Sequence, residues 1–105
     1  MADPDLVSAG LRAFRNIAVA WQLTEAEQAA LLGRSEDAGG SDDLLLRLSH
    51  VLGIFKAINM LLPDPARADE WLRKPNTAPL FNGRSAIDFM SSGRIDRLVA
   101  VRAYL

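Results

Sequence analysis

The sequence predicts an all-α fold: a compact, multi-helix domain built from a single chain of 105 residues. Three observations support this prediction. Apolar residues recur at helical spacings, and no segment sustains the period-two alternation of a strand. Residues that begin and end helices recur along the whole chain. Half of the residues are hydrophobic and 24% are charged, which is typical of a folded domain with one core.

The N-terminal part of the chain is predicted to form two helices. Asp3 and Pro4 suit the N-cap and the first helical position, and apolar residues then recur on one face up to Trp21. A capping-box pattern over 24–27 begins a second, short helix that ends at Gly33. We expect the apolar faces of both helices to contribute to the core.

A long central helix follows a polar, glycine-rich segment at 34–41. Ser41 is its predicted cap, and the stretch from Leu44 to Leu62 is apolar over most of its circumference. Such a helix must be covered either by the other helices of the domain or by a second copy. Since the other helices are few and short, we expect a homodimer formed through the N-terminal half and this helix.

Three shorter helices are predicted after the central one. Asp64 and Pro65 begin the first, which must end before Pro75. A loop over 76–83 comes next, and Ser85 then caps a short helix. The predicted ranges are 65–74, 85 to about 93, and about 94 to 105.

The composition excludes several classes of function. The chain has no cysteine and one histidine, so thiolate and histidine-cluster metal sites are excluded, and we predict no metal and no cofactor. We interpret His50 as a partly buried helix residue. Nucleophile elbows and phosphate-binding loops are missing from the sequence, and the helix dipole alone explains the Asp42-Asp43 pair. The sequence therefore predicts no catalytic residues and a protein that is not an enzyme.

Charge and hydropathy indicate location and partners. The net charge is −1, but residues 1–50 carry a net charge of −4 and residues 51–105 a net charge of +3. An anionic partner surface is therefore expected to meet the second half.

No uninterrupted apolar run reaches the roughly 18–20 residues that cross a bilayer, and the N-terminus lacks the features of a signal peptide. We expect a cytoplasmic protein without a membrane partner.

Residues 17–54 have the helix order of a helix-turn-helix motif, in which the second helix of the motif enters the DNA major groove. The segment that stands at that position, 34–43, holds two adjacent glycines and four acids: Glu36, Asp37, Asp42 and Asp43. Phosphate repels carboxylates, so this segment disfavours direct DNA binding, and the motif is degenerate. A DNA-bound regulator stays open as an alternative.

The stretch 71–93 has the order Trp-Leu-x-x-Pro-Asn, then Leu-Phe, then Gly-x-Ser-x-x-Asp-x-Met. A helix–loop–helix corner explains part of this order. The order also closely resembles the toxin-binding domain of Xre/MbcA/ParS-type antitoxins, and the resemblance extends over about 44–105. The residues of the structural motif are Trp71, Leu72, Pro75, Leu80, Phe81, Gly83, Ser85, Asp88, Met90 and Gly93.

The resemblance implies a type II antitoxin that neutralises a RES-domain toxin, of an NAD-depleting class, by covering its active-site cleft. It implies a dimerising, helix-turn-helix-like half over 1–62 and a toxin-binding region over 63–105, in one compact unit. The alternatives are a regulator of its own operon and a non-catalytic scaffolding module. Because arginine suits protein interfaces, the predicted toxin-binding residues are Arg73, Lys74, Asn76, Arg84, Arg94, Arg97 and Arg102.

Overall fold

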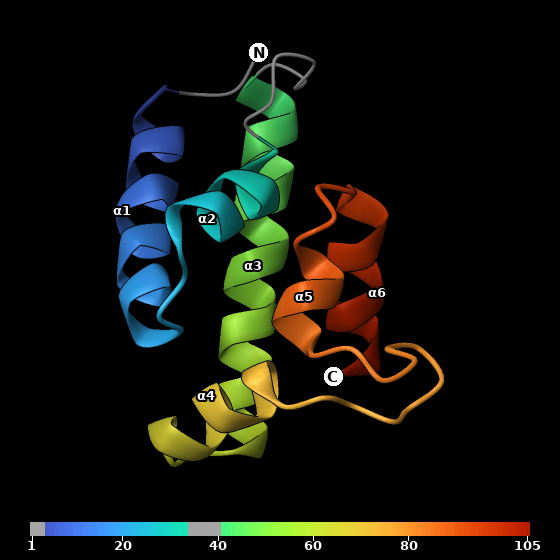
Figure 1. Ribbon diagram of the computed structural model, residues 1–105. Coiled ribbons are helices and arrows are strands. Elements are labelled where there is room, and N and C mark those ends of the chain that lie inside the picture. Colours follow the sequence, from blue (N-terminus) through green and yellow to red (C-terminus); the bar gives the residue numbers. More distant parts are fainter. Residues whose placement is uncertain (1–3, 34–40) are drawn as a thin grey trace.

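A computed structural model describes residues 4–33 and 41–105 (Figure 1). These ranges contain six α-helices and no strand, which confirms the predicted all-α class. The helices are α1 (Pro4–Ala20), α2 (Glu25–Leu32), α3 (Ser41–Leu61), α4 (Pro65–Arg73), α5 (Ala86–Met90) and α6 (Ile95–Tyr104).

Helix α3 is the centre of the molecule, and it packs against α1, α2, α4 and α6 (Figure 1). The side of α3 that faces the core is fully buried at Leu48, Val51, Ile54 and Ile58. Helices α1 and α3 run side by side in the same direction, since Gly10 lies against Leu48 near the start of both and the two rings farther along are 6.0 Å apart at Trp21 and Phe55. The prediction of a central, largely apolar helix is confirmed.

The expectation that no segment is long and apolar enough to cross a bilayer is wrong for α3. An 18-residue window within Asp43–Leu61 has a mean hydropathy of 1.5, because Arg47 and Lys56 interrupt the apolar run without lowering its average much. Length and composition alone do not separate a membrane span from a core helix. Here one side of α3 lies in the core, 28% of the window is buried, and the exposed large apolar side chains of the helix are Leu46, Met60 and Leu61.

The predicted helix starts are confirmed where side chains cap them. Thr24 Oγ1 accepts a hydrogen bond from the Glu27 amide at 3.1 Å, and the Glu27 carboxylate accepts one from the Thr24 amide at 2.9 Å. The side chains of Asp64 and Ser85 accept hydrogen bonds from the first turns of α4 and α5. Each cap satisfies an amide that has no partner within its helix.

One helix boundary differs from the sequence prediction. Helix α5 ends at Met90 rather than near Gly93, and the chain then turns through Gly93, whose φ is +85°. The predicted helix-turn-helix order is present as α1, α2 and α3. The acidic segment predicted to replace a DNA-reading helix falls mostly on 34–40, which lie outside the described residues.

Candidate functional site

The loop between α4 and α5 forms a closed corner. The Asn76 amide donates to the Arg84 carbonyl at 3.0 Å, and the Gly83 amide donates to the Asn76 carbonyl at 2.8 Å. The Asn76 side chain accepts a hydrogen bond from the Ala78 amide at 2.9 Å. Gly83 has a φ of +87°, which glycine adopts without strain. Asn76 thus holds the corner together, as the predicted turn requires.

Four aromatic rings lie behind this corner. Phe81 is buried at the centre, and its ring meets those of Trp71, Phe89 and Tyr104 edge to face, with centroids 5.3–5.9 Å apart. Trp71 is half-buried rather than fully buried and stacks on Tyr104 at 6.5 Å. The four rings join α4, the loop, α5 and α6, because edge-to-face and offset packing are the favoured geometries of aromatic pairs.

The cations predicted to bind a toxin fall into two groups. In the first group, each cation pairs with a nearby carboxylate on the surface, and both partners are more than half exposed. These pairs are Lys74 with Glu70, Arg84 with Asp88 at 3.7 Å, and Arg94 with Asp96 at 2.8 Å. Exposed pairs contribute little to stability, so a partner carboxylate can replace the internal one at small cost.

In the second group, the guanidinium is held by other parts of the chain. Arg73 donates to both oxygens of Glu27 at 2.9 and 3.1 Å, and to the carbonyls of Trp21 and Gln22 at 2.9 and 2.7 Å. Burial alone would raise the pKa of Glu27, but the hydrogen bonds from Arg73 and the Thr24 amide outweigh burial and hold that pKa below its usual range. Arg73 therefore joins α4 to the α1–α2 corner, a role that the sequence did not indicate.

The two cations on α6 also contact the chain, but neither forms an ion pair with a carboxylate of the described residues. The guanidinium of Arg97 lies 4.6 Å from the centroid of the Phe89 ring, a cation–π geometry. Arg102 lies over Gly53 of α3, where a β-carbon would overlap its guanidinium, and its Nη1 is 3.4 Å from His50 Nδ1. Burial and the charge of Arg102 lower the pKa of His50.

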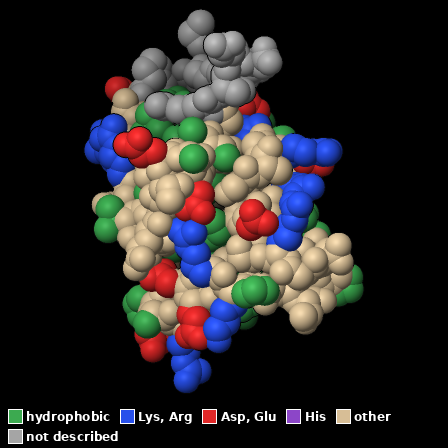
Figure 2. Space-filling model, viewed as in Figure 1, with side chains coloured by type: hydrophobic (Ala, Val, Ile, Leu, Met, Phe, Trp, Pro, Cys, Tyr) green, Lys and Arg blue, Asp and Glu red, His purple; other side chains and the backbone are tan. Residues whose placement is uncertain are grey.

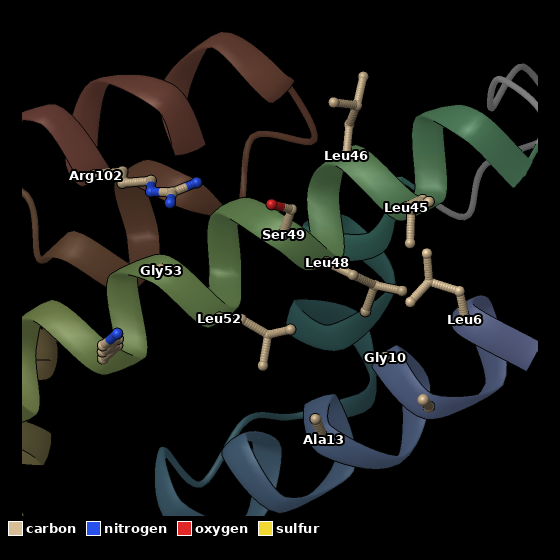
Figure 3. A pocket seen from close by; sticks show the side chains of 12 residues that line it. Leu6, Gly10, Ala13, Leu45, Leu46, Leu48, Ser49, Leu52, Gly53 and Arg102 are labelled. Carbon is tan, nitrogen blue, oxygen red and sulfur yellow. The ribbon is translucent and has the colours of Figure 1, made fainter. Parts of the chain in front are cut away.

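An apolar groove of about 890 Å³ runs between α1 and α3 (Figure 3). One wall comes from α1, the other from α3, and Arg102 lies at one end. The sequence predicted uncovered apolar surface on the long helix but not the groove itself. Its lining residues are Leu6, Ala9, Gly10, Ala13, Leu45, Leu46, Leu48, Ser49, Leu52, Gly53, Lys56 and Arg102.

The surface charge is mixed on the face shown in Figure 2, where Lys and Arg side chains alternate with Asp and Glu side chains. No large basic patch is visible on that face, so it does not have the electrostatic pattern of a nucleic-acid interface. Across the described part of the chain, no three His, Cys, Asp or Glu side chains lie together so that they could hold a metal ion.

Comparisons with known proteins give one family and one close relative. Residues 57–105 match the family model for the antitoxin Xre/MbcA/ParS C-terminal toxin-binding domain. The chain is 40% identical over 114 residues to the protein y4oB of Sinorhizobium fredii, which is described as uncharacterized; the match covers 99% of this chain and 87% of that protein. No solved structure gives a significant match. The matched range contains α4, the corner, the aromatic rings, α5 and α6.

Proposed function

This chain belongs to the antitoxin Xre/MbcA/ParS family through its C-terminal toxin-binding domain, and on that premise we propose that it neutralises a RES-type, NAD-depleting toxin by covering the active-site cleft. The observation that carries the proposal is the family match over 57–105. The protein then acts as a binding module in the cytoplasm and contributes no catalytic group.

The exposed cations of the second half are the contacts that we propose for the toxin. Among residues 4–33 and 41–105, Lys74, Arg84 and Arg94 form ion pairs only with surface carboxylates, and Arg97 lies over an aromatic ring. An arginine can exchange such a partner for a toxin carboxylate while its stem covers apolar surface. Arg73 and Asn76, whose polar atoms are used within the chain, then act indirectly by holding the corner in shape.

Co-expression with the neighbouring toxin gene tests this proposal. We expect the antitoxin to restore growth and to co-purify with the toxin. Reversing the charge at two proposed contacts, Arg84→Glu with Arg94→Glu, should abolish growth rescue and co-purification. A charge mismatch at a buried interface costs roughly 2–5 kcal/mol of binding free energy. The matched control is Arg12→Glu with Arg15→Glu, which changes the net charge equally on exposed positions of α1.

Circular dichroism should show the same helical content for both double variants. A variant with both toxin-facing charges reversed that still restores growth and co-purifies would place the interface elsewhere. Loss of function in the control variant would show that net charge, rather than position, decides neutralisation.

The helix order of α1, α2 and α3 favours a second candidate, a regulator that binds its own operator. The excess of acids in residues 1–50 opposes it, so we propose that the protein alone does not bind its promoter. A mobility shift at physiological ionic strength, with unrelated DNA as control, tests this point. A sequence-specific, salt-sensitive complex would restore the regulator hypothesis.

We also propose that the antitoxin is a homodimer. The uncovered apolar surface of α3 and the groove beside it support this state, because monomers rarely expose such continuous apolar surface. Light scattering across the micromolar range should give twice the mass of the chain. A monomer throughout that range would contradict the proposal.

A further inference from the structure

We infer that the groove between α1 and α3 binds a fatty acid, with its carboxylate held by Arg102 and Lys56 and its alkyl chain lying along the apolar walls. The inference goes beyond the proposed function, because it involves neither the toxin nor DNA. It rests on the composition of the lining, the charges toward one end, the length of the α3 wall and the exposure of the edges.

The lining of the groove is that of a small-ligand site. The groove has a volume of about 890 Å³, and its lining is apolar apart from the hydroxyl of Ser49 and two cations. Ligand pockets typically enclose about 300–1,000 Å³ and combine apolar walls with a few polar groups that orient the ligand. Beyond Leu6, the α1 wall consists of the small residues Ala9, Gly10 and Ala13, so a slender chain can lie close to the backbone.

The charged residues of the lining are both cations, and both lie toward the same end of the α3 wall. Lys56 is the last lining residue along α3. Arg102 reaches across α3 at Gly53, about one turn earlier (Figure 3). None of the lining residues is acidic. The ligand that complements this lining is apolar over most of its length and carries a negative charge at one end.

Both cations are available to such a charge. Lys56 and Arg102 are exposed, and neither forms an ion pair with a carboxylate of residues 4–33 and 41–105. The Arg102 guanidinium has the imidazole of His50 beside it, with Nη1 and Nδ1 3.4 Å apart, and an imidazole carries no negative charge. A guanidinium can donate to both oxygens of one carboxylate, and an ammonium group adds a further contact.

A carboxylate suits this end of the groove better than a phosphate. Phosphate groups are typically bound where the backbone amides of a helix N-terminus point at them. Arg102 lies instead in the last turn of α6, at the negative pole of that helix. A negative pole disfavours a doubly charged head group more than a singly charged one, so a fatty acid is favoured over an alkyl phosphate.

The α3 wall indicates the length of the alkyl chain. From Gly53, where Arg102 lies, back to Leu45, the wall is about 12 Å long at about 1.5 Å per residue. An extended chain of about ten carbons, with C–C bonds of about 1.5 Å, covers the same distance. Decanoate is therefore the shortest fatty acid that reaches along the whole apolar part of the wall.

The edges of the groove leave room for the homodimer proposed above. Leu6 and Leu46 are 54% and 55% exposed, whereas Leu48 between them is 1% exposed. A chain that lies between the two walls leaves the outer faces of Leu6 and Leu46 for a second copy. The ligand and the dimer are therefore compatible, and binding can be measured in either state.

Titration of the full chain with sodium decanoate tests the inference without any toxin. Proton–nitrogen correlation spectra should show saturable shifts of the amide signals of Gly10 and Gly53, one from each wall. Octanoate, which is two methylene groups shorter, should bind about tenfold more weakly. Decyltrimethylammonium has the same chain with a positive head group, and it should not shift these two signals because the cations of the groove repel it.

Arg102→Gln and Lys56→Gln test the contacts to the carboxylate. Each substitution should weaken the binding of decanoate about tenfold, because it removes a hydrogen bond to a charged group. The matched control is Arg94→Gln, which removes an exposed arginine that is paired with Asp96 and does not line the groove, and it should leave the affinity unchanged. Circular dichroism should show the same helical content for all three variants.

The outcomes separate a fatty-acid site from the other occupants of such a groove. No saturable binding of decanoate overturns the inference, and so does equal binding of decanoate and decyltrimethylammonium, which would indicate general adsorption on apolar surface. If decanoate does not bind and Arg102→Gln weakens the dimer in light scattering, the groove belongs to a second copy. Growth rescue and toxin co-purification are separate measurements, so failure of decanoate binding leaves the antitoxin proposal standing.

Discussion

Two regions of the molecule contain the same local arrangement, an arginine side chain lying over a glycine of a neighbouring element. At the junction of α2 and α3, Arg47 lies over Gly33; between α3 and α6, Arg102 lies over Gly53. Arg47 is only 8% exposed and pairs with Asp43 at 2.8 Å. Arg102 is exposed and pairs with no carboxylate of the described residues.

The difference in burial separates a structural cation from one that can bind a partner. Transferring a guanidinium from water into the protein interior costs free energy. Burial of Arg47 is therefore tolerated only with the Asp43 carboxylate as its partner and with close packing around it. Its Nη1 atom is buried without a hydrogen-bond partner among the described residues, which adds to that cost. Arg102 keeps its hydration, and its charge is available to a second molecule.

Truncating each arginine should give the largest contrast between the two regions. We expect Arg47→Ala to lower the free energy of unfolding by about 3 kcal/mol, the low end for breaking a buried pair because Asp43 is 29% exposed. Arg102→Ala should change it by less than about 0.5 kcal/mol. Urea unfolding measures both, at one protein concentration because dimer formation also adds stability. Equal losses would show that burial does not distinguish the two contacts.

Adding a methyl group to each glycine should give a smaller contrast of the same kind. Gly33 has a φ of +67°, so Gly33→Ala should cost about 2 kcal/mol from the left-handed conformation and from displacement of Arg47. Gly53 is helical, and alanine there gains about 0.5–1 kcal/mol of helix propensity while it shifts only an exposed side chain. Thermal unfolding should therefore separate the variants. A Gly53→Ala variant as unstable as Gly33→Ala would contradict this account.

The ion pair of Arg73 and Glu27 is partly buried, with side-chain exposures of 39% and 21%. Removing it should have the smallest effect on stability of the three changes. Arg73→Gln should cost at most about 1 kcal/mol at neutral pH, since the Arg73 side chain is 39% exposed and water screens the pair. Because the folded state lowers the pKa of Glu27, its contribution is fully present above the ordinary pKa of glutamate and is lost as the pH falls through the lowered value.

The test of this third prediction is the free energy of unfolding measured as a function of pH. Glu27→Gln should flatten the acidic part of the wild-type curve, and Arg73→Gln should flatten it partly, because the Thr24 amide still donates to Glu27. A wild-type slope that is unchanged in Glu27→Gln would assign the acid dependence to other carboxylates.

Sequence reasoning predicted the features that depend on residues close together in the chain. The caps at Thr24, Asp64 and Ser85 and the turn at Asn76 each involve partners within three residues, so their patterns are visible in the sequence. The apolar residues around most of the circumference of α3 were visible for the same reason, since helical periodicity shows which sides of one helix are apolar.

Contacts between distant residues could not be predicted in this way. Arg73 and Glu27 are 46 residues apart, and Arg102 and His50 are 52 apart, so no spacing rule relates them. Arg73 was predicted to contact a toxin because it is a cation next to a motif, whereas its donors point into the α1–α2 corner. The groove was missed because its two walls come from separate helices whose packing the periodicity does not specify.

The family match begins at residue 57, inside α3, and this position has a consequence for cutting the protein into parts. Leu98 and Val101 of α6 are fully buried in a core that also contains Val51 and Ile54, which precede the match. A fragment that starts at 57 would expose these side chains to water and lose the partners of Arg73. We therefore expect one cooperative unfolding transition for the whole chain, so that the toxin-binding domain folds only together with the helices that precede it.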